Sequence, residues 1–228
     1  MPVTLFSTLA VKKALDDVLL QAFTAETGIE VVGVFDPTVQ LRGRIERGET
    51  FDVMVAVTES FADLKSVVDS SSVVPVARTG VGLAVAKDAV RPDISTTDAF
   101  VRALREARSV AYSRTGASGI YFADLIERLG IAAEINERAT VIEKGFIANA
   151  VVDGRADLAV QQLSELLFVP EADIVGPFPA EVQHYSEFSA ALHVNAVGYP
   201  EARRFVDYLT SPTAAEAYAK TLLELPVT

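Results

Sequence analysis

Four short polar segments directly follow predicted apolar strands, and their composition suits the binding of a small anion. The segments are Ser7-Thr8, Asp36-Pro37-Thr38, Ser113-Arg114-Thr115-Gly116-Ala117-Ser118-Gly119 and Gln161-Gln162. In open α/β sheets, ligands bind beyond the carboxyl ends of the strands. Three of the segments precede a clear helical pattern, and a helix N-terminus offers unpaired N–H groups and about half a positive charge. This arrangement predicts anion binding without a lysine.

The third segment adds the groups best suited to a carboxylate or an oxyanion. The guanidinium of Arg114 can donate two parallel hydrogen bonds to a pair of oxygens. Gly116 and Gly119 allow the main chain to approach a ligand closely. We therefore predict ligand contacts for Ser113, Arg114, Ser118 and Gly119, with a structural ion pair as an equally good explanation of Arg114.

Structural roles compete with ligand roles in the other segments. For any single segment, an N-cap role is the simpler explanation of Ser, Thr or Asp, because these residues are favoured at helix starts. Adjacent amides at the end of a buried strand need hydrogen-bond partners and seldom cap helices, so a ligand role and a structural role explain them equally well. The predicted ligand contacts also include Ser7, Thr8, Thr38, Gln161 and Gln162.

Alternating strand and helix patterns position these segments. The first part of the chain predicts strands at 3–6, 29–35, 52–57 and 81–86, helices at 11–22, 39–47 and 60–68, and a loop at 70–75. The middle predicts strands at 109–113, 139–142 and 157–161 and helices at 97–107, 118–129 and 146–152. Strands at 172–175 and 187–194 and helices at 201–209 and 212–222 follow. This order is typical of an α/β fold with doubly wound sheets.

Composition excludes several classes of function. The 228 residues carry a net charge of −11 with scattered basic residues, whereas nucleic-acid binding requires a concentrated cationic face. The absence of cysteine removes disulfides, thiolate metal sites and cysteine nucleophiles, and His184 and His193 alone do not predict a histidine-rich metal site. We therefore expect no cofactor and no metal. We also expect no membrane insertion, because no apolar run approaches the roughly 18 residues that a membrane-spanning helix needs.

Several stretches resemble the molybdate-binding component of ABC transporters, a type 2 periplasmic binding protein. They are Phe6-Ser7-Thr8-Leu9, Phe35 to Leu41, Phe51-Asp52-Val53, Ala117-Ser118-Gly119-Ile120-Tyr121 with Leu129-Gly130, and Gly154-Arg155-Ala156-Asp157. The resemblance covers essentially the whole chain and implies two lobes, each a doubly wound mixed sheet flanked by helices. It implies that 1–80 with 184–228 and 81–183 form the two lobes, joined by two crossing hinge strands around a ligand cleft.

The same resemblance implies how a ligand is bound and delivered. Uncharged donors at helix N-termini would fall on Ser7, Thr38 and the Ser118 region, and the lobes would close by a hinge motion. An ABC permease is the implied partner if the protein is exported. The chain starts without a leader pattern, which predicts a cytoplasmic protein if Met1 is the native start and a periplasmic one if a signal peptide has been removed.

Three departures from the family pattern favour an organic carboxylate over a metal oxyanion. Asp36-Pro37-Thr38 stands where transporter members usually have a run of serines, Gln161-Gln162 stands where a tyrosine is expected, and Arg114 adds a full charge. Planar donors match the planar oxygens of a carboxylate. We therefore expect a non-catalytic protein that binds a small anion, with an organic carboxylate as the favoured ligand.

The sequence also resembles aconitate isomerase, at Val110-Ala111-Tyr112-Ser113 through Tyr121 and at Gln161-Gln162-Leu163-Ser164-Glu165-Leu166. This second resemblance implies an alternative function, that of a cofactor-independent isomerase of an unsaturated polycarboxylate. Such an enzyme needs a base beside an acidic C–H bond. The motifs do not identify this base, and Glu165, Glu143 and His184 are the candidates.

Overall fold

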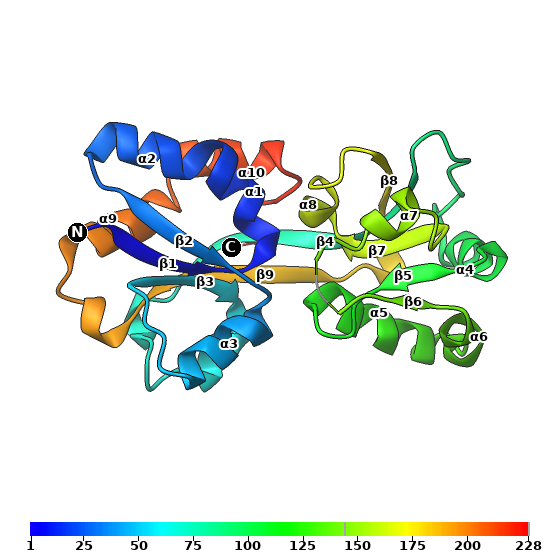
Figure 1. The fold of residues 1–228 in the computed structure, drawn as a ribbon, viewed down its shortest axis with the longest axis horizontal. Coiled ribbons are helices and arrows are strands. Elements are labelled where there is room, and N and C mark those ends of the chain that lie inside the picture. Colours follow the sequence, from blue (N-terminus) through cyan, green and yellow to red (C-terminus); the bar gives the residue numbers. More distant parts are fainter. Residues whose placement is uncertain (144, 228) are drawn as a thin grey trace. The chain divides into compact units, whose positions relative to one another are not determined.

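The computed structural model describes residues 1–143 and 145–227, which fold into two compact units (Figure 1). Unit 1 comprises Met1–Arg78 and Glu187–Thr228, and unit 2 comprises Thr79–Ser186. Two strands, β4 (Val74–Ala86) and β9 (Tyr185–Leu192), contain residues of both units. The chain therefore passes from one unit to the other twice, once in each of these strands.

The sheet of unit 1 brings three strand ends together. Its strand order is β2-β1-β3-β9. β1 (Val3–Ser7) pairs in parallel with β2 (Val31–Phe35) and β3 (Val53–Val57), and β9 is antiparallel to β3. Ser7 is in register with Phe35 on one side and Val55 on the other. The carboxyl ends of β1, β2 and β3, with the residues that directly follow them, form one edge of the sheet, here called edge 1.

Helices cover both faces of this sheet. One continuous helical segment follows β1 and comprises a 3₁₀ turn at Leu9–Val11, α1 (Lys12–Ala14), a π-helical stretch at Leu15–Leu19 and α2 (Leu20–Thr27). It ends at Gly28, whose φ of 71° is left-handed and favours glycine. This segment lies on the same side of the sheet as α9 (Pro200–Tyr208) and α10 (Pro212–Lys220) (Figure 1). Phe23 and Phe205 are buried together in the core between these helices and the sheet. α3 (Thr38–Glu46) contributes Leu41 to the second core of the unit.

The sheet of unit 2 has the strand order β8-β4-β7-β5-β6. β5 (Val110–Tyr112) is parallel to β6 (Thr140–Val141) and β7 (Leu158–Gln162), and β4 is antiparallel to β7 and β8 (Ala172–Pro177). The carboxyl ends of β5, β6 and β7, with the residues that directly follow them, form edge 2.

Alternation along β7 separates the two cores of unit 2, because successive side chains of a strand point to opposite faces. Leu158 and Val160 pack on one face with α4 (Thr97–Glu106), α5 (Ala117–Arg128) and α6 (Ala132–Glu137). Ala159 packs on the other face with α7 (Asn149–Val152) and α8 (Leu163–Leu166). Both faces of the sheet are therefore covered, as the nearly continuous apolar strands predict.

The predicted α/β fold with mixed, helix-flanked sheets is confirmed, and the local structure differs from the prediction in several places. The helix predicted at 60–68 is a 3₁₀ helix at Thr58–Asp63, because the main chain of Val67 and Val68 pairs with residues 193 and 194 instead. The strand predicted at 81–86 begins at Val74, within the predicted loop. Pro75 is tolerated there because it lies next to the first residue of the strand. The helices α6 and α8 were not predicted.

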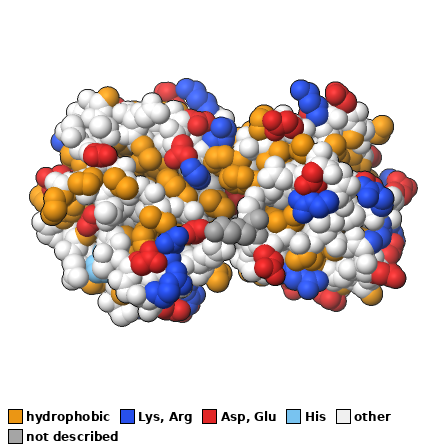
Figure 2. Space-filling model, in the orientation of Figure 1, with side chains coloured by type: hydrophobic (Ala, Val, Ile, Leu, Met, Phe, Trp, Pro, Cys, Tyr) orange, Lys and Arg blue, Asp and Glu red, His pale blue; other side chains and the backbone are white. Residues whose placement is uncertain are grey.

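Charged side chains of both signs are interspersed on the face of each unit that Figure 2 shows. Several form ion pairs, such as Arg78 with Glu224 (2.6 Å) and Arg108 with Asp157 (3.0 Å). Over residues 1–143 and 145–227, no helix is long and apolar enough to cross a membrane.

Candidate anion-binding site

The neighbouring strands hold the main chain of Ser7 and Thr8 at edge 1. The N–H of Thr8 donates to the carbonyl of Val55 (2.9 Å), and the N–H of Asp36 donates to the carbonyl of Ser7 (3.2 Å). Ser7 is fully buried, and its hydroxyl donates to the carbonyl of Thr8 (3.2 Å). The sheet therefore fixes the starting point of the helical segment that begins at Leu9.

Among the described residues, the helical segments that begin at edges 1 and 2 start without a side-chain cap, as α9 also does. Thr8, Pro37 and Gly116 are their N-cap residues, and in the described part of the chain none of these three caps its helix through a side chain. By contrast, the hydroxyl of Thr96 accepts from a first-turn N–H of α4 (3.2 Å), and Ser211 caps α10 in the same way. Side-chain capping therefore does not explain the serine, threonine and aspartate residues of the segments at these edges.

Edge 1 also contains a threonine and a lysine. Thr38 is the first residue of α3, and its hydroxyl accepts from the N–H of Val57 (3.5 Å). The ammonium group of Lys12 lies 4.4 Å from the centre of the ring of Phe35, the last residue of β2, and forms an ion pair with Asp16. Sequence reasoning missed Lys12, because a lysine four residues before an aspartate is typical of a solvated helix face.

The acidic residue at edge 1 is neutralised by an ion pair. Asp36 is buried (7% exposed), and its carboxylate accepts a hydrogen bond from Nε of Arg44 (2.8 Å). Arg44 also binds Glu49 (2.8 Å). Because the guanidinium offsets the charge of Asp36, this carboxylate does little to repel an anion at edge 1.

Ser113 shapes the loop that joins β5 to α5 at edge 2. Its hydroxyl accepts hydrogen bonds from the N–H groups of Thr115 (3.1 Å) and Gly116 (3.3 Å). The hydroxyl of Thr115 donates to the carbonyl of Glu143 (3.2 Å), a residue that follows β6. These bonds hold the loop in one conformation, so Ser113 has a structural role in presenting the first turn of α5.

Gly119 lies in that first turn and packs directly on the end of β5. A Cβ atom at residue 119 would lie 1.6 Å from the carbonyl oxygen of Ser113. At residue 116 the nearest atom would be the hydroxyl of Ser113, at 3.8 Å. Of the two glycines in this loop, Gly119 is therefore the one that the close approach of α5 to the strand requires.

Arg114 and Ser118 complete the predicted contacts in this loop. Arg114 is exposed, and among the described residues it forms no ion pair and no side-chain hydrogen bond. The structural ion pair considered for Arg114 is therefore not found there, and its guanidinium is accessible to a ligand. Ser118 is buried (5% exposed) in the first turn of α5.

The two glutamines point to opposite faces of the sheet and have protein partners. Oε1 of Gln161 accepts from the N–H of Ile147 (2.8 Å), and Nε2 donates to Glu165 (2.6 Å). Gln162 accepts from the hydroxyl of Ser186 (2.7 Å), and its amide nitrogen donates to the carbonyls of residues 79 and 80 (3.3 Å each). Gln162 thus links β4 and β9 where these strands leave unit 2. These hydrogen bonds give the buried amide of Gln162 a structural role.

Glu165 is the acidic side chain that follows β7 at edge 2. It is partly buried in α8, and burial raises the pKa of its carboxyl to about 7, while the hydrogen bond from Gln161 acts in the opposite direction. The neighbouring hydroxyl of Ser164 is fully buried and has no hydrogen-bond partner among the described residues. The sequence named Glu165 as one of three candidate bases, and the structure distinguishes it by its burial.

The other two candidate bases are exposed. Glu143 contacts the loop of edge 2 through its main-chain carbonyl. The ring of His184 stacks on that of Tyr121, with the ring centres 4.6 Å apart. In the described ranges, no group of three or more histidine, aspartate and glutamate side chains is arranged to hold a metal ion.

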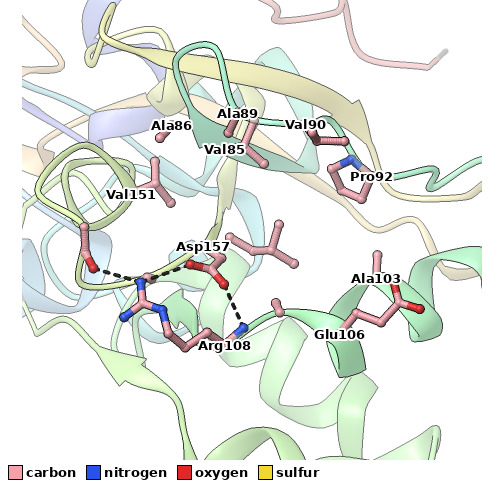
Figure 3. Close-up of a pocket in the computed structure, with 14 residues that line it drawn as sticks. Val85, Ala86, Ala89, Val90, Pro92, Ala103, Glu106, Arg108, Val151 and Asp157 are labelled. Carbon is pink, nitrogen blue, oxygen red and sulfur yellow. Dashed lines mark hydrogen bonds and ion pairs between the residues drawn. The ribbon is translucent and has the colours of Figure 1, made fainter.

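A separate pocket of about 500 Å³ lies at the opposite, amino-terminal ends of β5 and β7 (Figure 3). Its wall is mostly apolar, with Val85 and Leu158 among the lining residues. The guanidinium of Arg108 at this pocket donates to Asp157 (3.0 Å) and to the carbonyl of Gly154 (2.9 Å), as Figure 3 shows. None of the predicted ligand contacts lines this pocket, so it is distinct from edge 2.

Comparison with known proteins relates the chain to binding proteins and to an enzyme. The model of a family described as bacterial extracellular solute-binding protein matches residues 3–221. The sequence is 34% identical over 205 residues to the aconitate isomerase of Pseudomonas sp., covering 86% of this chain and 78% of that protein. It is 24% identical over 228 residues to the molybdate-binding protein ModA of Escherichia coli (strain K12), covering 96% and 87%.

The fold is also similar to that of a solved structure, the periplasmic molybdate-binding protein of Azotobacter vinelandii. The TM-score is 0.79 and the sequence identity is 18%, with 99% of this chain and all (100%) of that chain covered. The predicted type 2 periplasmic-binding-protein fold is therefore confirmed, as is the resemblance to molybdate-binding proteins and to aconitate isomerase.

Proposed function

Because the chain belongs to the bacterial extracellular solute-binding protein family, we propose that it binds a small organic carboxylate through edges 1 and 2. The observation that carries this proposal is that helical segments begin at the carboxyl ends of β1, β2 and β5, and that, over the described residues, they start without a side-chain cap, as α9 also does, so their first-turn N–H groups face these edges without a side-chain acceptor. First-turn N–H groups that lack a side-chain acceptor suit an anion.

The cations near the edges support a carboxylate rather than a tetrahedral metal oxyanion. Arg114 is exposed beside the first turn of α5, and its planar guanidinium matches the two coplanar oxygens of a carboxylate. Lys12, whose ammonium group is paired with Asp16, lies next to Phe35 at the end of β2 and adds a second cationic group near edge 1. An anion with more than one carboxylate can use both cations, and the identity to aconitate isomerase supports a polycarboxylate.

We also propose that a single anion takes hydrogen bonds from both edges, in the inter-lobe cleft expected from the family resemblance. Closure would then bend the chain in β4 and β9, the strands shared by the units. Delivery of the anion to an ABC permease is part of the same proposal.

A panel of anions tests the ligand class by thermal unfolding. At about 100 times its dissociation constant, a ligand adds roughly 2.7 kcal/mol of stability, which corresponds to about 5–10 °C in Tm for a chain of this size. We expect this rise with citrate, cis-aconitate or trans-aconitate and none with molybdate or tungstate. A rise with the metal oxyanions alone would exclude the carboxylate, and no rise with any of them would exclude anion binding at these edges.

A second candidate function is favoured by one observation at edge 2. Glu165 follows β7 at edge 2, and burial raises the pKa of its carboxyl to about 7. A group of this kind can accept and return a proton at neutral pH. This supports the alternative of a cofactor-independent isomerase of an unsaturated polycarboxylate, to which the protein with 34% identity also points.

A further inference from the structure

The side chains of Glu165 and Gln161 form a connected group at the end of β7. Nε2 of Gln161 donates to Oε2 of Glu165 (2.6 Å), and Oε1 of Gln161 accepts from the N–H of Ile147 (2.8 Å). The main chain of Ile147 therefore orients the amide of Gln161, and this amide in turn orients Oε2 of Glu165. Among the described residues, the second carboxylate oxygen of Glu165, Oε1, has no hydrogen-bond partner.

This group follows β7, and the loop that contains Arg114 follows β5, the neighbouring strand of the unit 2 sheet. β5 and β7 are adjacent and parallel, and Ala111 is in register with Ala159. Ser113 and Gln161 each lie two residues beyond this pair, toward the carboxyl ends of the two strands. The carboxyl group and the anion donors therefore belong to the same edge of one sheet.

The surroundings of Glu165 contain little charge. It lies on α8, which contacts β7 and β8. β7 contains no ionisable residue, and the acidic residue of β8, Asp173, is paired with Arg91 (3.2 Å). Burial is the main cause of the raised pKa, about 7, so the carboxyl is divided between its two protonation states near neutral pH. Glu165 remains partly exposed, so a bound molecule can reach it.

We propose that Glu165 is the catalytic base that moves a proton between two carbons of a bound unsaturated polycarboxylate, with Gln161 as its positioning residue. The proposal rests on the proposed function, because it requires that a polycarboxylate binds at edge 2. Glu165 would contact the substrate directly, whereas Gln161 would act by orienting Glu165.

The proton balance of this step is complete without a cofactor. Glu165 takes a proton from the CH₂ carbon beside a substrate carboxylate, and the electron pair of that C–H bond moves into a new C=C bond. The pair of the original C=C bond moves to the far alkene carbon, where the adjacent carboxylate delocalises it. The protonated Glu165 then returns the proton to that carbon, which forms a new C–H bond. The product is a double-bond isomer, and nothing is oxidised or reduced.

Incubation of the full chain with trans-aconitate in deuterated water tests the proposal by NMR. Wild-type protein should form cis-aconitate and introduce solvent deuterium into both isomers. E165Q should be slower by roughly 100-fold or more, which is the usual contribution of a general base. Its dissociation constant for trans-aconitate should stay within about threefold, a change below 1 kcal/mol. E171Q, in which an exposed glutamate just beyond α8 loses its charge, is the matched control and should behave as wild type.

The positioning role of Gln161 is tested by the pH dependence of the isomerisation rate. A purely structural effect of the substitution would lower the rate without shifting this dependence along the pH axis. The hydrogen bond from Gln161 lowers the pKa of Glu165, so removing it in Q161L should raise that pKa. Because the base is active when ionised, the acid limb of the rate profile should move to higher pH. An unchanged limb in a folded Q161L variant would overturn the positioning role.

The outcomes separate this proposal from the function on which it rests. If wild-type protein binds trans-aconitate but gives neither cis-aconitate nor deuterium incorporation, Glu165 is not a catalytic base and the binding function stands. If E165Q retains the wild-type rate, another residue is the base. If trans-aconitate and citrate do not bind at all, the proposed function fails and the catalytic role fails with it.

Discussion

The Gly119→Ala variant is expected to lose roughly 100-fold in affinity for trans-aconitate, because two or more charge-assisted hydrogen bonds from the first turn of α5 would be lost. The new methyl group would lie 1.6 Å from the carbonyl oxygen of Ser113, which is main chain and cannot rotate away. The N-terminus of α5 must therefore move away from β5. This overpacking should also lower the free energy of unfolding by about 1–3 kcal/mol.

The Gly116→Ala variant is the matched control for this change. Gly116 has a φ of −88°, which alanine adopts without strain, and its nearest neighbour would lie 3.8 Å from the added atom. Affinity by calorimetry and stability by thermal unfolding should both stay close to wild type. If the two alanine variants bind trans-aconitate equally well, the first turn of α5 does not hold the anion.

The Arg114→Ala variant is expected to weaken trans-aconitate binding by roughly 10- to 100-fold, the usual contribution of a hydrogen bond to a charged group. Arg114 is exposed and unpaired among the described residues, so its removal should leave the stability of the unliganded protein unchanged. Arg114→Lys should restore only part of the affinity, because an ammonium group keeps the charge but lacks the planar pair of donors.

The control for this second change is Arg105→Ala. Arg105 lies on α4, where its Nε donates to Glu134 (3.1 Å), and it belongs to neither edge. Calorimetric titration should give a wild-type dissociation constant for this variant. An Arg114→Ala protein that binds as tightly as Arg105→Ala would show that the guanidinium makes no contact with the ligand.

Local patterns in the sequence were sufficient for most of the fold. The first helical segment follows β1 and ends before β2, and the apolar runs around Val53 and Leu158 form buried strands, as the sequence predicts. These features depend on residues close together in the chain. The early start of β4 at Val74 was not predictable in this way, because Pro75 in isolation indicates a loop.

The strand ends were predictable, but the partners of their side chains were not. Gly116 and Gly119 look equivalent in the sequence, and only the packing of α5 on Ser113 distinguishes them. Gln161 binds Ile147, which lies 14 residues earlier in the chain. Likewise, the burial that raises the pKa of Glu165 arises from tertiary packing, so no local pattern reports it.

The most direct test of the central claim is to follow the backbone amide signals of the protein by NMR during titration with trans-aconitate. If one anion is bound by the helix N-termini of both edges, the largest shifts should occur at the amides of 9–11 and of 117–119, with the same dissociation constant for both groups. Shifts confined to one edge, or centred on the pocket of Arg108 and Asp157, would contradict the claim.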